Sequence, residues 1–178
     1  MSEYDELAKM VAEAASSTIL LLKSARPAEH ISGYALCTDD SLSTLFHVAT
    51  SREFCAKSPI RDVQFLAIEW PYDEGRDLFD EPYARLSALH KKARASEAFA
   101  SHLESSFAAL QGALLSLRKN NLVDQDVLLV VTSTDPGRWS RRRTVEAVRK
   151  LNSAELFQRW VAAQGNLGDL SEGAISAS

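Results

Sequence analysis

Cys37 and His47 are the two residues best suited to nucleophilic chemistry in this chain. A thiolate formed beside an imidazole is a strong nucleophile, and the two residues lie in segments that we expect to pair as a hairpin. Both fall inside expected strands rather than at a loop or helix N-terminus, and buried cysteine is commonly a small apolar filler. We therefore favour packing roles. A small enzyme that uses Cys37 with His47, or with a carboxylate such as Glu69, is kept as an alternative.

Asp39 and Asp40 form a second compact pair of groups, suited in principle to acid–base or metal chemistry. A turn explains them better, because aspartate side chains accept hydrogen bonds from backbone groups two residues on. The 4 histidines are scattered without metal-ligand spacing. The chain also lacks the GxGxxG, GxxxxGK[ST] and GxSxG motifs. We expect no metal and no cofactor.

Charged and aromatic residues are densest between residues 69 and 81, where six carboxylates accompany one base, Arg76. Aromatic side chains among charges suit a protein interface, because Trp and Tyr supply contact area while charges steer an oppositely charged partner. The expected partner-binding residues are Glu69, Trp70, Tyr72, Asp73, Glu74, Asp77 and Asp80. Trp70 and Tyr72 would be the anchors. The alternatives are an ion pair at a strand end for Glu69 and packing against the adjoining helix for the two aromatic residues.

A basic cluster of Arg138, Arg141–Arg143, Arg149 and Lys150 adjoins the last predicted helix. Cations at a helix N-terminus are unfavourable by a few tenths of a kcal/mol, which indicates another role for the arginines. We expect salt bridges to Asp77 or Asp80, or a solvated basic face. An anion- or RNA-binding patch is the alternative. The net charge of -4 argues against nonspecific nucleic-acid binding and favours a basic partner.

The length of 178 residues, with 46% hydrophobic and 25% charged residues, is ordinary for one folded domain. We expect a globular domain over residues 1–163 and a flexible tail over 164–178. The chain has 2 cysteines, no signal-peptide pattern and no apolar run of the roughly 20 residues that span a bilayer. These features predict a cytoplasmic protein without a transmembrane segment.

Apolar residues at three-to-four spacing predict helices over about 5–23, 81–95, 96–119 and 144–163. The last helix is expected to break near Asn152-Ser153, with Ser153 as the cap of its second part. Ser51 to Lys57 is expected to be a short helix capped by Thr50 or Ser51.

Strands are predicted over 31–38 and 43–50, as an antiparallel hairpin, and over 63–70 and 126–132. The order of helix, three strands, two helices, strand and helix lacks the alternation of a doubly wound sheet. It predicts an α+β fold with a mostly antiparallel sheet of about four strands packed against several helices.

Several short motifs follow one another along the chain. They are Tyr34 to Asp40 (YALCTDD), Glu69 to Asp73 (EWPYD), a Leu-rich helix, Val127 to Val131 (VLLVV), and a helix whose first half ends at Leu151-Asn152. In this order, over roughly residues 5–163, they resemble a family of uncharacterised bacterial proteins defined only as a domain of unknown function. Members of that family occur near polymorphic toxin and contact-dependent competition genes. The resemblance implies a cytoplasmic bacterial protein, with an immunity role for some members, and it assigns no catalytic residues.

The leading hypothesis is a non-enzymatic immunity protein that neutralises a cognate bacterial toxin. The acidic segment would meet a basic cleft of the toxin, such as that of a nuclease. The alternatives are the small enzyme described above and a regulatory module that binds nucleic acid through the basic cluster at 138–150.

Overall fold

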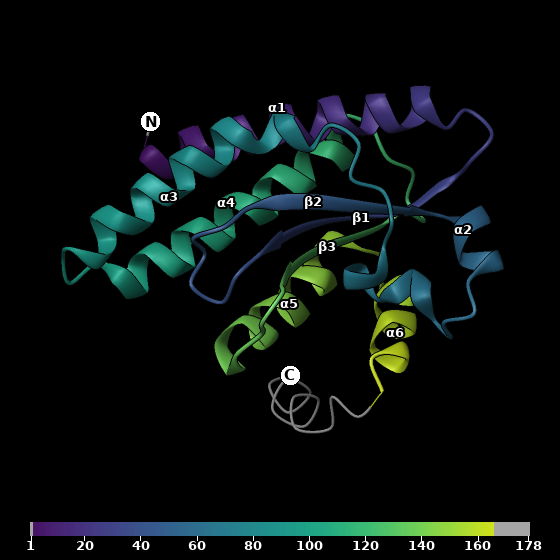
Figure 1. The fold of residues 1–178 in the computed structure, drawn as a ribbon. Helices are drawn as coiled ribbons and strands as arrows, with labels where there is room; N and C mark the ends of the chain where they lie inside the picture. Colours follow the sequence, from purple (N-terminus) through teal and green to yellow (C-terminus); the bar gives the residue numbers. More distant parts are fainter. Residues whose placement is uncertain (1, 166–178) are drawn as a thin grey trace.

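A sheet lies at the centre of the fold between two layers of helices (Figure 1). The computed structural model describes residues 2–165. Helices α1 (Glu3–Ala25), α3 (Asp80–Arg94) and α4 (Phe99–Lys119) cover one face of the sheet. Helices α5 (Arg138–Leu151) and α6 (Ala154–Ala163) cover the other face. The predicted α+β class is confirmed.

The sheet has three strands within the described residues, in the order β2-β1-β3. The central strand β1 (Ile31–Thr38) pairs antiparallel with β2 (Phe46–Ser51) and parallel with β3 (Leu128–Ser133). The predicted hairpin is confirmed, whereas the expectation of about four strands in a mostly antiparallel sheet is wrong. A parallel pair requires a long crossover, and the chain between β2 and β3 supplies it with α3 and α4.

The segment predicted as a third strand, residues 63–70, forms two 3-10 turns, η1 (Val63–Phe65) and η2 (Ala67–Glu69). Its buried residues Val63, Phe65 and Ala67 alternate with less buried ones, which imitates the period of a strand. The Trp70 indole N–H donates to the Val63 carbonyl at 2.9 Å, so the segment closes on itself. A single bridge between Ala49 and Tyr72 is its nearest pairing with the sheet.

The helices follow the predicted periodicity and caps. The stripe of α4 buries Phe107, Leu110, Leu114 and Leu117. Helices α5 and α6 are separated at Asn152-Ser153, and Ser153 caps α6 by accepting from Leu156 N–H at 3.2 Å. The short helix α2 (Arg52–Lys57) has Ser51 as its N-cap. The break at Asn152-Ser153 and the caps are confirmed, whereas α5 begins at Arg138, earlier than the predicted start at about residue 144, so Arg141 to Arg143 lie inside its first turns.

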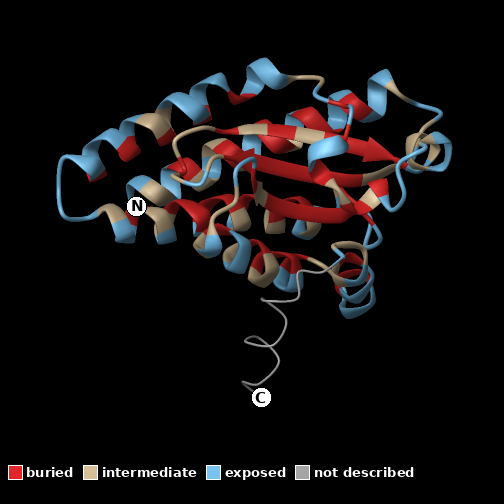
Figure 2. Ribbon diagram, turned by 60° about the horizontal axis from the view of Figure 1, so that its bottom comes forward, coloured by how far each residue is buried: buried red, intermediate tan, exposed pale blue. Residues whose placement is uncertain are grey.

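The strands form the buried centre of the molecule, and the outer helix faces are exposed (Figure 2). Tyr34 and Leu36 of β1 pack in the core beneath α1 and α4, while Ala35 and Cys37 pack in the core beside α6. Alternate side chains of one strand therefore enter different cores, as the pleat requires.

The predicted flexible tail, 164–178, falls almost wholly outside the described residues. Within residues 2–165, none of the helices combines the length and apolar character needed to cross a bilayer.

Candidate protein-interaction site

Residues 69–81, which we call the acidic segment, run along the outer edge of β2 and lead into α3. Ala49 N–H donates to the Tyr72 carbonyl at 2.7 Å, and Tyr72 N–H donates to the Ala49 carbonyl at 3.1 Å. Beyond this bridge, a 3-10 turn, η3 (Arg76–Phe79), passes directly into α3. Two backbone hydrogen bonds therefore fix the segment at Tyr72, directly before the exposed Asp73.

Trp70 packs inside the molecule and is only 4% exposed. Its indole lies so close to Gly33 of β1 that a Cβ atom at position 33 would be 2.5 Å from Trp70 Cη2. Only glycine admits this approach, because any other residue would place a carbon atom in the ring's position. The burial of Trp70 favours the packing alternative and does not fit an exposed anchor.

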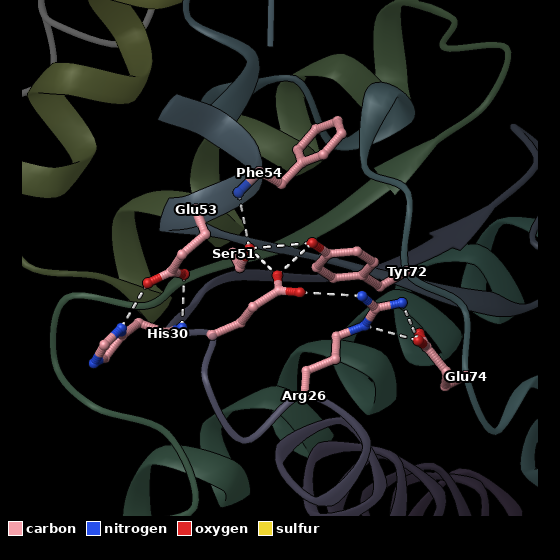
Figure 3. A network of polar contacts seen from close by, with 8 residues as sticks. Arg26, His30, Ser51, Glu53, Phe54, Tyr72 and Glu74 are labelled. Carbon is pink, nitrogen blue, oxygen red and sulfur yellow. Dashed lines mark hydrogen bonds and ion pairs between the residues drawn. The ribbon is translucent and has the colours of Figure 1, made fainter. Parts of the chain in front are cut away.

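Tyr72 is also buried, and a polar network holds it (Figure 3). The Arg26 guanidinium lies 3.7 Å from the centroid of the Tyr72 ring. The Tyr72 hydroxyl donates to Glu29 at 2.5 Å, and Ser51 donates to the same carboxylate oxygen. Hydrogen bonds from Ser51 and Tyr72 lower the pKa of Glu29 below its ordinary value. Tyr72 is therefore an internal anchor between the end of α1 and the edge of β2.

Glu74 belongs to the same network. Arg26 donates to it through Nε at 2.8 Å and also through Nη2, and Arg26 Nη1 donates to Glu29 at 3.2 Å. The single guanidinium thus neutralises two carboxylates from distant parts of the chain. We conclude that Glu74 holds the segment in place and presents little charge to a partner.

Asp73, Asp77 and Asp80 are exposed and lie on or beside η3 and the first turn of α3. Asp73 lies 3.9 Å from Arg76, a long ion pair, and no ion pair within residues 2–165 engages Asp77 or Asp80. Glu69 is exposed as well, at the end of η2, before the buried Trp70. Asp80 also stabilises the N-terminus of α3 through the helix dipole, which gives it a structural role of its own.

Exposed apolar side chains accompany these carboxylates. Leu78 is 39% exposed and Tyr83 is 43% exposed. Gly75 has a φ of +80°, and a Cβ atom there would lie 3.1 Å from both Leu21 of α1 and Leu78. Leu21 and Leu78 therefore both lie beside this glycine. We define the acidic surface as Leu21, Asp73, Asp77, Leu78, Asp80 and Tyr83. Its apolar members were not predicted from the sequence, although their adjacency to the carboxylates of residues 73–81 is visible for Leu78 and Tyr83.

Cys37 and His47 do not form a catalytic pair. In the hairpin register His47 lies opposite Leu36, and Cys37 lies opposite Phe46, so the two side chains enter different faces of the sheet. Burial raises the pKa of the Cys37 thiol to about 12, which suppresses the reactive thiolate. His47 is stacked between the rings of Tyr34 and Phe79.

Asp39 and Asp40 organise the hairpin loop. Asp39 accepts from Ser43 N–H at 2.7 Å and from the Ser41 hydroxyl at 3.2 Å, which supports the turn interpretation, although the backbone donor lies four residues on and not two. Asp40 instead reaches α5, where it accepts from Gly137 N–H at 3.1 Å and from Ser140. It thereby satisfies an N–H group at the start of that helix, a role normally taken by a cap residue of the helix itself. The sequence gives no sign of this long-range contact.

Two members of the basic cluster, Arg142 and Arg143, are paired with nearby carboxylates. Arg142 and Arg143 form ion pairs with Glu146, at 3.0 and 2.6 Å, and Arg143 also pairs with Glu104 of α4. The prediction of salt bridges to Asp77 or Asp80 is therefore wrong. The i,i+4 spacing of Arg142 and Glu146 was a signal available in the sequence. Within residues 2–165, no group of three or more His, Cys, Asp or Glu side chains is arranged to hold a metal ion.

Fold and exposed chemistry together define an α+β domain with a helix-covered mixed sheet and a fixed acidic surface along one edge. The chain belongs to the family described as Domain of unknown function (DUF4303), whose profile matches residues 11–153. The resemblance to an uncharacterised family is thus confirmed, and the match includes the whole acidic surface. Neither the curated proteins nor the solved structures provide a significant match.

Proposed function

We propose that this protein is a non-enzymatic immunity protein that binds and neutralises a cognate bacterial toxin in the cytoplasm. The carrying observation is the acidic surface, in which Asp73, Asp77 and Asp80 accompany exposed apolar side chains. The toxin would present a basic surface, such as the substrate cleft of a nuclease. The choice of a toxin as the partner follows from the resemblance seen in the sequence, which implies an immunity role for some members of the family.

The composition of the surface suits recognition of a basic protein. Leu21, Leu78 and Tyr83 would provide the apolar contact area that we first assigned to Trp70 and Tyr72. The carboxylates would raise the rate of encounter with a positively charged partner, because long-range attraction orients the two proteins before contact. The net charge of -4 acts in the same direction.

The polar network beneath the surface supports tight binding. The two hydrogen bonds to Ala49 and the contacts of Arg26 with Glu74 and Tyr72 fix the segment before a partner arrives. A fixed segment loses less conformational entropy on association than a loop that must be ordered. In this proposal, Glu74, Trp70 and Tyr72 contribute by holding the surface rather than by contacting the toxin.

The test is co-purification from the source bacterium with three forms of the tagged protein. These are the wild type, the variant D73N/D77N/D80N, and the control E13Q/E97Q/E155Q, which removes the same charge from exposed positions elsewhere. We expect the wild type and the control to retain one basic protein that the first variant loses. That protein should arrest growth when expressed alone in a second host and should be harmless with the wild-type chain.

Equal recovery of the basic protein by D73N/D77N/D80N would reject this surface. A partner that is harmless when expressed alone would reject the immunity role. We expect the variant to fold, because neutralising Asp80 costs α3 at most about 1 kcal/mol of dipole stabilisation. Circular dichroism of the variant checks this expectation.

A further inference from the structure

A cleft adjoins the acidic surface at the end of the sheet where β1 and β3 finish. It has a volume of about 480 Å³ and lies between the hairpin loop, η3 and the first turns of α3. Its walls include Asp39, Phe46, Arg76, Asp80, Tyr83 and Thr134. Two carboxylates and three aromatic rings, with Phe79 as the third ring, thus line a space large enough for a long side chain.

The chain's own Arg76 already places a cation in this cleft. Its guanidinium lies 5.7 Å from the centroid of the Phe46 ring, a distance at which a cation is attracted to the face of an aromatic ring. The hold is weak, because the Arg76 side chain is 68% exposed and its one ion pair, to Asp73, spans 3.9 Å. Arg76 is therefore only loosely held beside the Phe46 ring.

The charge of the cleft favours a second cation. Burial tends to raise the pKa of Asp39, but hydrogen bonds from Ser43 and Ser41 outweigh it and hold the pKa below its ordinary value. Asp39 is therefore anionic at neutral pH, and the exposed Asp80 also lines the cleft. The N-terminus of α3 opposes a cation by a few tenths of a kcal/mol, which two nearby carboxylates offset.

We propose that this cleft receives an arginine side chain of the basic partner, and that Arg76 leaves the Phe46 ring to admit it. A planar guanidinium fits better than an ammonium, because it stacks on rings and donates to carboxylates in the same plane. The identity of the partner as a toxin rests on the proposed function. The preference of the cleft for a guanidinium is a property of this chain alone. Arg76 acts as an internal competitor.

The experiment uses a small probe, N-acetyl-arginine methylamide, titrated into the isotope-labelled full-length protein and followed by NMR. We expect saturable shifts of the ring signals of Phe46 and Tyr83. Arg76→Ala should tighten binding about two- to fivefold, because it removes the competing cation. Asp80→Asn should weaken it about threefold. The control Arg61→Ala removes the same charge from a side chain that is 95% exposed outside the cleft and should leave binding unchanged.

The neutral isostere N-acetyl-citrulline methylamide should not bind. The inference is overturned if this analogue binds as well as the arginine probe, if Arg76→Ala weakens binding or leaves it unchanged, or if the Phe46 and Tyr83 signals do not move. The titration requires no partner protein. If the cleft binds the probe but the protein retains no toxin in the co-purification, only the proposed function is contradicted. If the protein retains a toxin but the cleft does not bind the probe, only the inference about the cleft is contradicted.

Discussion

His47 should make the stability of this protein fall steeply in mild acid. The side chain is fully buried between the rings of Tyr34 and Phe79, whose centroids lie 5.5 and 5.1 Å from its own. Neither ring nitrogen meets the geometry of a hydrogen bond within residues 2–165, although the Glu74 backbone lies close enough to favour the protonated form. Burial lowers the pKa of His47 to about 4, and the nearby charges of Asp73 and Glu74 only partly oppose this shift.

The sign and size of the effect follow from the pKa of His47 in the two states, which is 6.5 in the unfolded chain and about 4 in the folded chain. Well above pH 6.5, His47 is neutral in both the folded and the unfolded chain and does not affect the free energy of unfolding. As the pH falls from 6.5 to about 4, the unfolded chain takes up a proton that the folded chain excludes, so stability is lost. At about 1.4 kcal/mol for each pH unit, the loss reaches about 3 kcal/mol.

The assay is urea denaturation of the wild type and of His47→Leu at intervals between pH 7 and pH 4. Leucine removes the titration and the two unpartnered nitrogens at similar volume. We expect the variant to lie within about 1 kcal/mol of the wild type at pH 7, because lost ring stacking and removed polar atoms offset each other. Its loss of stability in acid should be smaller by about 3 kcal/mol.

Leu36→Val provides the matched control, because Leu36 lies opposite His47 in the hairpin register and is buried in the same core. It should lower stability by about 1 kcal/mol at every pH. If His47→Leu loses as much stability between pH 6.5 and pH 4 as the wild type, the reasoning from burial is refuted.

Two further changes test the interior. Gly33→Ala should lower the free energy of unfolding by about 1–3 kcal/mol in urea denaturation, because its Cβ atom would displace the Trp70 ring; an unchanged midpoint would contradict that contact. Cys37 should resist alkylation in the native protein at neutral pH while the half-buried Cys55 reacts, with mass spectrometry of the digested protein as the measurement. Rapid native labelling of Cys37 would return the cysteine-dependent enzyme to consideration.

The sequence predicts the local parts of this fold well. The stripe of α4 and the separation of α5 from α6 depend on residues within a few turns of one another, such as Ser153 and Leu156. The hairpin is equally local. The parallel pairing of β1 with β3 joins Gly33 to Leu128 and has no local signal. The number and direction of strands therefore had to come from the structure.

The candidate site shows the same limit. Asp73, Asp77 and Asp80 lie on or beside η3 and the start of α3, so their grouping follows from their closeness in the chain. Trp70 and Tyr72 turn inward because of Gly33 and Arg26, which lie more than thirty residues earlier. The sequence shows that aromatic residues accompany the carboxylates. Their contacts with residues far away in the chain bury them, so they support the acidic surface from beneath and are not part of it.

The most direct test of the central proposal is the association rate between this protein and the partner that co-purifies with it, measured across ionic strengths from about 0.05 to about 0.5 M. We expect the wild type and E13Q/E97Q/E155Q to associate quickly at low salt and more slowly as salt rises. D73N/D77N/D80N should associate at least about tenfold more slowly at low salt, with little dependence on salt. An equal rate and an equal salt dependence for this variant would contradict recognition through the acidic surface.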